Sequence, residues 1–255
     1  MSNPRTAAGA VAPSLSERDQ ATIELVARFR QLKTSQIRAV LFADHASTTP
    51  ADRCLKRLVE GKYLERLPRP IGGRGGSGQF VYQLGRAGWK LLDRPGHFWA
   101  PRAVDLHCLG IADCFVALKQ AEQRGEVVLL EFITEPDCHT SIGPVRLTPD
   151  ARLEVGDRAQ GVKIAYWLEL DRGTEHRSVI AEKCSRYWKA LHYWRQEFFP
   201  TVLFVVQDLR RARQLLEAVC GGPDGSQAAF KVATIDEFIA ACLSRSVKGV
   251  VASES

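Results

Sequence analysis

The sequence predicts an α/β protein, α+β overall, with two structural units. Residues 15–94 show three helix patterns followed by two short strand patterns. Residues 103–243 show a helix, three strands, a helix, a strand, a helix, a strand and a last helix. Arg94-Pro95-Gly96 separates the two runs, because proline and glycine together end a regular element. We therefore expect a small N-terminal unit and a larger sheet-containing unit, with tails at 1–14 and 244–255.

Composition places the chain among ordinary globular proteins. Of its 255 residues, 45% are hydrophobic and 25% are charged, which excludes a mostly disordered or fibrous chain. No apolar run reaches the roughly 18 residues of a membrane span, and the first 15 residues lack the apolar segment of a secretory signal. The seven cysteines form no C-x-x-C pair, so reduced and buried thiols are expected. These features predict a cytoplasmic protein with no membrane partner.

Positive charge is concentrated in the first part of the chain. Residues 1–100 contain 16 Lys and Arg against 8 Asp and Glu, whereas residues 101–255 contain 19 against 21. A basic surface raises the local concentration of polyanions. The asymmetry therefore predicts a nucleic-acid partner for the N-terminal unit.

Local capping signals predict three N-terminal helices. Ser16, with Asp19 three residues later, begins a helix over Ser16–Arg30. After a break at Leu32-Lys33-Thr34, a second helix runs over Ser35–Phe42. Ser47-Thr48-Thr49-Pro50 precedes a third helix over Ala51–Glu60, because proline is tolerated in the first turn.

Two strand patterns and a glycine-rich loop follow the third helix. The strands are Tyr63–Leu67 and Gln79–Leu84, and the loop between them carries Arg69 and Arg74. A short helix over Gly85–Leu92 closes the unit. Three helices followed by a basic hairpin are typical of a winged helix-turn-helix, which places one helix in the major groove of duplex DNA and its hairpin on the backbone.

The third helix is the predicted recognition helix. Its apolar side is formed by Leu55, Leu58 and Val59. The predicted DNA-binding residues are Thr48, Thr49, Arg53, Lys56 and Arg57 at this helix, and Arg69 and Arg74 on the hairpin. The alternative is a solvated basic surface without a ligand, since charge runs usually have that role. The glycine-rich loop lacks the G-x-x-x-x-G-K-[ST] order of a nucleotide-binding loop.

The second unit has the pattern of a sheet covered by helices. The expected helices are Val104–Gln123, Ser178–Phe199, Leu209–Val219 and Ile235–Leu243. The expected strands are Val127–Thr134, Arg146–Leu153, Val162–Asp171, Thr201–Val206 and Phe230–Ala233. The run Thr201–Val206 is apolar throughout, which is typical of a central strand buried on both faces.

Pro149-Asp150 and Glu169-Leu170-Asp171 fall on two neighbouring predicted strands, and this order resembles the restriction-endonuclease-like core of the PD-(D/E)xK nuclease superfamily. The resemblance implies Asp150, Glu169 and Asp171 as ligands of Mg²⁺ or Mn²⁺, which favour carboxylate oxygens. The third motif position holds Asp171 where the superfamily has lysine, and Lys183 on the next helix is the candidate replacement. Further oxygen ligands are available at Glu131, Glu135 and Asp113.

Three other groups of residues are weaker candidates. His107, Cys108, Asp113 and Cys114 share one helix, but their spacing does not suit a zinc site. Asp137-Cys138-His139 is expected in a surface loop, where adjacent residues rarely act as a thiol and base pair. The aromatic residues Tyr187, Trp188, Tyr193 and Trp194 are expected to pack against the sheet, with stacking on unpaired bases as the alternative.

From Leu15 to about Phe238 the chain resembles the replication-relaxation family. The stretches that carry the resemblance are Ser16-Glu17-Arg18-Asp19, Phe29-Arg30-Gln31-Leu32, Leu58-Val59-Glu60-Gly61-Lys62-Tyr63-Leu64, Val81-Tyr82-Gln83-Leu84-Gly85, Pro149-Asp150-Ala151 and Leu168-Glu169-Leu170-Asp171-Arg172-Gly173-Thr174-Glu175. The family implies binding to plasmid or mobile-element DNA more firmly than it implies a reaction.

These observations lead to one main hypothesis and two alternatives. The main hypothesis is a sequence-specific duplex DNA-binding protein that acts in replication, relaxation or transfer of a plasmid or mobile element. We expect a homodimer that works with replication or relaxosome proteins. The alternatives are a metal-dependent nuclease that nicks DNA and a winged-helix transcriptional regulator.

Overall fold

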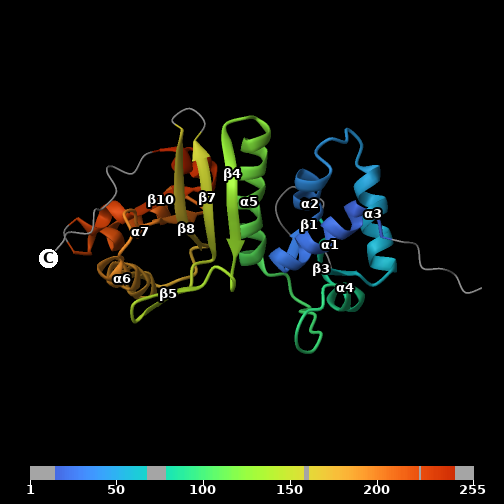
Figure 1. Cartoon of the computed structure of the whole chain (residues 1–255), viewed down its shortest axis with the longest axis horizontal. Helices are drawn as coiled ribbons and strands as arrows, with labels where there is room; N and C mark the ends of the chain where they lie inside the picture. Colours follow the sequence, from blue (N-terminus) through green and yellow to red (C-terminus); the bar gives the residue numbers. More distant parts are fainter. Residues whose placement is uncertain (1–14, 68–78, 158–160, 224, 245–255) are drawn as a thin grey trace, which may run out of the picture.

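The computed structural model describes residues 15–67, 79–157, 161–223 and 225–244 and is a mixed helix and sheet structure, as predicted (Figure 1). The N-terminal unit contains α1 (Glu17–Phe29), β1 (Gln31–Lys33), α2 (Thr34–Leu41), α3 (Thr49–Glu60), β2 (Leu64–Leu67), β3 (Val81–Leu84) and α4 (Arg86–Leu91). Strand β3 lies between β1 and β2 and pairs antiparallel with both.

Helix α1 begins as the capping pattern predicts. The backbone N–H of Asp19 donates to Ser16 Oγ at 3.2 Å, and the backbone N–H of Ser16 donates to Asp19 Oδ2 at 3.0 Å. These two bonds satisfy amide groups that have no partner within the helix. The buried side of α1 then follows the helical period and includes Ile23 and Val26.

Strand β1 lies where the sequence predicts only a break between two helices. It has three residues, and Leu32 lies opposite Tyr82 of β3. A strand this short shows no alternation that a sequence pattern can detect. Its pairing with β3, some 50 positions away, makes it a strand.

Two glycines allow α4 to lie directly against the backbone near β2. A Cβ at Gly85 would lie 2.3 Å from the carbonyl oxygen of Lys62, and one at Gly88 would lie 2.3 Å from that of Tyr63. The backbone N–H of Gly85 donates to Tyr63 O at 2.8 Å. No larger residue fits at either position without moving backbone.

The second unit is a five-stranded sheet with helices on both faces. Its elements are α5 (Leu106–Gln123), β4 (Val127–Thr134), β5 (Thr140–Ile142), β6 (Val145–Leu147), β7 (Ala151–Asp157), β8 (Val162–Asp171), α6 (Arg177–Tyr193), β9 (Thr201–Val206), α7 (Leu209–Cys220), the 3-10 turn η1 (Ser226–Ala229), β10 (Phe230–Thr234), the 3-10 turn η2 (Ile235–Glu237) and α8 (Phe238–Leu243). The strand order is β10-β9-β8-β7-β4. Strands β4, β7 and β8 are antiparallel neighbours, whereas β8, β9 and β10 run parallel.

Side-chain alternation on the central strand β9 divides the core between the two faces. Leu203 and Val205 belong to the cluster that contains α5 and α8, and Phe204 belongs to the cluster that contains α6 and α7. All six residues of β9 are buried, as expected of a strand with both faces covered.

Three of the predicted elements in this unit are wrong in their bounds. The predicted strand Arg146–Leu153 is two strands, because Val145–Leu147 pairs with β5 in a hairpin and β7 begins only at Ala151. Pro149 lies between them and has no N–H to donate to a ladder. Helix α6 ends at Tyr193 and not at Phe199, and the predicted helix Ile235–Leu243 opens with the 3-10 turn η2.

The hydrophobic core continues from one unit into the other. The ring of Phe29 in α1 lies 5.1 Å from the ring of Phe115 in α5, which lies 5.2 Å from the ring of Phe132 in β4. Helix α5 stands between the sheet and the N-terminal unit in Figure 1. The α4–α5 connection with Arg94-Pro95-Gly96 therefore joins two units that share one core. Among the described helices none is long and apolar enough to cross a membrane.

Buried polar side chains also fasten the two units together. Gln36 Nε2 of α2 donates to Leu109 O at 2.8 Å and to Asp113 Oδ1 at 2.6 Å, both in α5. Gln31 Nε2 donates to Ala103 O at 3.0 Å. Both glutamines are almost fully buried, so these bonds hold the N-terminal unit in one orientation on α5.

Candidate nucleic-acid interface and carboxylate cluster

Helix α3 has one buried side and one basic exposed side. Leu55 and Leu58 are in the core, whereas Arg53 and Lys56 are exposed. Within the described residues no acidic side chain lies within ion-pair distance of Arg53. Lys56 Nζ lies 3.8 Å from Glu60 Oε1, an exposed contact of the kind that contributes little. Thr48 and Thr49 are exposed at the start of the helix. The side that carries Arg53 and Lys56 is therefore free to contact a polyanion.

Arg57, the third predicted contact on this helix, has a structural partner. Its Nη2 donates to Asp19 Oδ1 of α1 at 2.6 Å, and the Asp19 side chain is only 3% exposed. Burial by itself would raise the pKa of Asp19, but hydrogen bonds from Arg57 and Ser16 outweigh it and lower the pKa to about 2. Arg57 therefore anchors α3 to α1 while about half of its side chain stays exposed.

The hairpin arginines Arg69 and Arg74 lie outside the described residues. The described part of the hairpin contributes a different basic residue, Arg66 on β2, whose guanidinium lies 4.1 Å from the centre of the Phe80 ring. Arg66 is exposed. The strand pattern does contain this arginine, but its register against β3 determines that it stacks on Phe80 beside the hairpin.

Glu169 is buried at the centre of the predicted nuclease-like site. Its side chain is 3% exposed, Lys183 Nζ lies 2.9 Å from its Oε2, and Tyr187 Oη donates to its Oε1 at 2.6 Å. Burial raises the pKa of Glu169 to about 7, although Lys183 opposes this shift. Glu169 raises the pKa of Lys183 despite burial of the ammonium group. Lys183 of α6 is thus the cation beside Glu169.

Asp171 is held by an arginine that sequence analysis missed. Arg211 of α7 forms a bidentate pair with it, with Nε 2.8 Å from Oδ1 and Nη2 2.7 Å from Oδ2. The backbone N–H of Gly173 also donates to Asp171 Oδ1, at 2.5 Å. The same Arg211 Nη2 donates to Glu175 O at 2.7 Å. Asp171 therefore joins α7 to the turn after β8. It carries no positive charge, so it cannot take the role of the motif lysine.

Both oxygens of Asp150 have partners as well. Its Oδ2 accepts from the backbone N–H of Leu170 at 2.7 Å, and its Oδ1 lies 3.0 Å from Nε2 of His107 in α5. The hydrogen bond to Asp150 raises the pKa of His107 although burial opposes it. His107 is a second residue whose role the sequence does not reveal, because it lies 43 positions before its partner.

The side chains proposed as metal ligands do not fit a divalent cation in this arrangement. Glu169 pairs with Lys183, Asp171 pairs with Arg211, Asp150 contacts His107, and all three carboxylates are nearly buried. A cation would have to displace these three partners. In the described part of the chain no group of three or more His, Cys, Asp or Glu side chains is placed to bind a metal ion.

The additional oxygen ligands considered from the sequence are also paired. Glu131 Oε2 lies 3.2 Å from Arg152 Nη1, and Glu135 forms an ion pair with Arg30. Asp113 Oδ2 lies 3.0 Å from Lys33 Nζ. Asp113 and Glu135 therefore connect the N-terminal unit to the sheet unit.

The cysteines of the two weaker candidate groups are buried in apolar surroundings. Burial raises the pKa of both Cys108 and Cys138 to about 12. Cys138 Sγ donates to Pro149 O at 3.0 Å, and Cys108 Sγ donates to Asp105 Oδ2 at 3.1 Å. A raised pKa keeps both thiols protonated at neutral pH, which is unlike the lowered pKa of a reactive cysteine.

The aromatic residues of α6 pack mainly within the protein. The ring of Tyr187 lies 5.6 Å from that of Trp167, and the ring of Trp188 lies 5.8 Å from that of Phe230. The ring of Trp194, the residue that follows α6, lies 5.9 Å from the ring of Trp167 in β8. Tyr193 is 41% exposed. Packing against the sheet, the expected use, accounts for three of the four.

Comparisons with known proteins identify one family. The model of the replication-relaxation family matches residues 23–202, which run from within α1 to the start of β9 and include Asp150 and strand β8 with Glu169. No curated protein and no solved structure matches the chain.

Proposed function

Because the chain belongs to the replication-relaxation family, we propose that it binds duplex DNA of a plasmid or mobile element and acts there in replication, relaxation or transfer. The observation that carries this proposal is the exposed side of α3, where Arg53 has no acidic partner among the described residues. In the same helix Arg57 is committed to Asp19, so α3 is held rigidly while its basic side remains available.

The arrangement of the N-terminal unit supports docking as a winged helix. Strand β1 lies between α1 and α2, and α3 comes directly before the β2–β3 hairpin that completes the three-stranded antiparallel sheet. In winged helix-turn-helix proteins this helix enters the major groove. The hairpin follows with Arg66 on its described part, and phosphate contacts from such side chains position a protein without reading sequence.

For the second unit we propose a nuclease-like core that serves binding and assembly and does not cleave DNA. Strands β4, β7 and β8 form an antiparallel meander, and α6 leads to β9, which runs parallel to β8. This order supports the resemblance to the PD-(D/E)xK core. The ion pairs of Glu169 and Asp171 and the His107 contact of Asp150 argue that these carboxylates have become structural.

DNA binding is tested by fluorescence anisotropy with two duplexes of equal length, one from the origin region of the element and one unrelated. Binding is expected to weaken steeply between about 50 and 200 mM salt. Arg53→Ala and Lys56→Ala are each expected to weaken binding to the origin duplex by about tenfold. Joint replacement of Arg69 and Arg74 is expected to lower the salt slope by about two. Arg146→Ala removes an equal charge from the distant β6 strand and is the control.

Two results of that experiment would contradict the proposal. The first is that the wild-type chain binds neither duplex at low salt. The second is that the α3 variants bind as tightly as the wild type while the Arg146 control is equally unaffected. A preference for promoter duplexes over origin duplexes would instead identify a transcriptional regulator.

A metal-dependent nuclease is the second candidate function, because Lys183 lies beside Glu169 as a relocated motif lysine would. The test incubates supercoiled plasmid with the full chain and Mg²⁺ or Mn²⁺, with Asp150→Ala alongside. We expect no nicking that depends on Asp150. Nicking by the wild type that the variant lacks would establish the nuclease instead.

We also propose that the chain binds its site as a homodimer, together with replication or relaxosome proteins. A symmetric or repeated DNA site matches a protein dimer with two α3 helices. Sedimentation of the complex with a single origin duplex gives the stoichiometry, and one protein chain per duplex would contradict this part of the proposal.

A further inference from the structure

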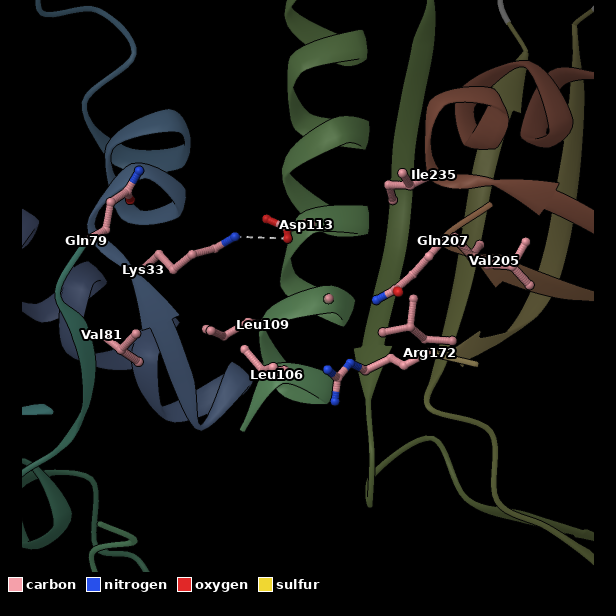
Figure 2. A pocket seen from close by; sticks show the side chains of 13 residues that line it. Lys33, Gln79, Val81, Leu106, Leu109, Asp113, Arg172, Val205, Gln207 and Ile235 are labelled. Carbon is pink, nitrogen blue, oxygen red and sulfur yellow. Dashed lines mark hydrogen bonds and ion pairs between the residues drawn. The ribbon is translucent and has the colours of Figure 1, made fainter. Parts of the chain in front are cut away.

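A crevice of about 420 Å³ lies where the sheet meets the N-terminal unit (Figure 2). Arg172 follows β8, Gln207 follows β9 and Ile235 follows β10, so the crevice adjoins the carboxyl ends of three parallel strands. Ligands of open α/β sheets bind outside the carboxyl ends of parallel strands. The volume is also that of a small-ligand site.

The polar lining of the crevice favours an anion. Figure 2 shows the guanidinium of Arg172 and the amide of Gln207 extending from the strand ends toward α5. Within the described residues Arg172 forms no ion pair and no hydrogen bond through its side chain. On the opposite wall Lys33 Nζ lies 3.0 Å from Asp113 Oδ2. Two cations therefore face one carboxylate, and an unpaired guanidinium is well suited to a phosphate.

The remaining walls are apolar. They include Leu109 of α5, Leu170 of β8 and Val205 of β9. A Cβ at Gly110 would lie 2.4 Å from Leu170 Cδ2, so the glycine allows α5 to approach β8 at this point. Apolar walls beside a cation and an amide suit a base that carries a phosphate.

The crevice lies on the opposite face of β8 from the carboxylates of Glu169 and Asp171. Successive side chains of a strand point to opposite faces. Glu169 and Asp171 contact α6 and α7, whereas Leu170 and Arg172 line the crevice against α5. The crevice is thus separate from the nuclease-like cluster, and it does not need those carboxylates.

We infer that this crevice binds a single nucleotide, with its phosphate on Arg172 and its base between the apolar walls near the Gln207 amide. The inference rests on the proposed function, because β1 and β3 of the DNA-binding unit contribute Lys33 and Val81 to the crevice. The nucleotide is either free or an unpaired unit of the bound DNA. Both have the same phosphate and base.

The test uses the full chain with two probes. The first is deoxyadenosine monophosphate, titrated by calorimetry. The second is a duplex with a one-nucleotide single-stranded gap, compared with the intact duplex by anisotropy. Arg172→Ala removes the phosphate partner, and Leu106→Trp fills the crevice from a position that is 49% exposed. Neither change removes a described hydrogen bond or ion pair, and circular dichroism verifies the fold. Arg146→Ala is the charge-matched control.

We expect Arg172→Ala and Leu106→Trp to weaken binding of the nucleotide by at least tenfold, with the control unchanged. Binding of the free monophosphate identifies a free nucleotide as the ligand. Tighter binding of the gapped duplex alone, lost in both variants, identifies an unpaired unit of the DNA. The inference is overturned if the chain binds duplex DNA normally while neither probe depends on Arg172. If the wild type binds no DNA, the proposed function fails. The calorimetric titration then still shows whether the crevice binds a nucleotide.

Discussion

Replacing Arg57 with alanine is expected to lower the free energy of unfolding and to affect DNA affinity less than Arg53→Ala does. Arg57 is the cation that pairs with Asp19 across the α1–α3 interface, at 2.6 Å. Its removal leaves a carboxylate that is 3% exposed with only Ser16 and the Cys54 thiol as partners. A buried charge that loses its counter-ion is costly.

The size of the effect follows from the pKa of Asp19. That pKa falls from an ordinary 3.8 to about 2, and each unit corresponds to about 1.4 kcal/mol. The partners of Asp19 therefore stabilise the folded chain by about 2.5 kcal/mol at neutral pH. The hydrogen bond from Arg57 is the largest of the contributions that lower the pKa, so Arg57→Ala should cost about 1 to 2 kcal/mol.

The pH dependence gives the prediction a sign. Because the folded pKa of Asp19 is lowered, its stabilisation is present above pH 3.8 and is lost as the pH falls toward about 2. The difference between wild type and Arg57→Ala should shrink over that window. Urea unfolding, followed by tryptophan fluorescence at pH 7 and near pH 3, measures it.

Arg53→Ala is the matched control, since it changes an exposed arginine of the same helix. It should change the free energy of unfolding by less than about 0.5 kcal/mol while weakening DNA binding. The double variant with Asp19→Asn should lose little beyond Asp19→Asn alone, because the pair is then already broken. The reasoning is refuted if Arg57→Ala unfolds at the wild-type urea concentration and loses DNA affinity to the same extent as Arg53→Ala.

Three further predictions concern stability. Lys183→Met leaves Glu169 without its cation. Since the pKa of Glu169 is about 7, urea unfolding should show that the variant loses about 3 kcal/mol of folding free energy at pH 8 and less at pH 6, where the carboxyl is mostly neutral. An equal loss at both pH values would contradict this prediction. Gly88→Ala forces a Cβ to within 2.3 Å of Tyr63 O and should cost about 1 to 3 kcal/mol in the same assay, and no loss would show that α4 moves freely. A fragment of residues 15–95 exposes the side of Phe29 that contacts Phe115, so it should lack the near-ultraviolet circular dichroism of a fixed core, and a cooperative melting transition in the fragment would overturn this expectation.

The elements that sequence analysis predicted correctly are those with signals inside the element. The start of α1 depends on Ser16 and Asp19, which are three residues apart. This spacing is visible in the sequence and predicts both capping hydrogen bonds. Strand β9 is a six-residue apolar run, and no neighbour is needed to recognise it. Strands β1 and β5 have three residues each. They are strands only because β3 and β6 lie beside them, so the sequence contains no comparable signal.

The sequence alone determined the excess of positive charge in the first hundred residues, the basic side of α3, and the position of Glu169 and Asp171 at the end of a strand. Tertiary structure decided which of these charges face solvent. Asp19 and Arg57 are 38 positions apart, and Asp171 and Arg211 are 40 apart. A charged side chain is neutralised by an opposite charge within about 4 Å. Residues that are far apart in the sequence come this close only when the chain folds. For the same reason Arg172, which follows Asp171 directly in the sequence, lines a crevice on the other face of the sheet.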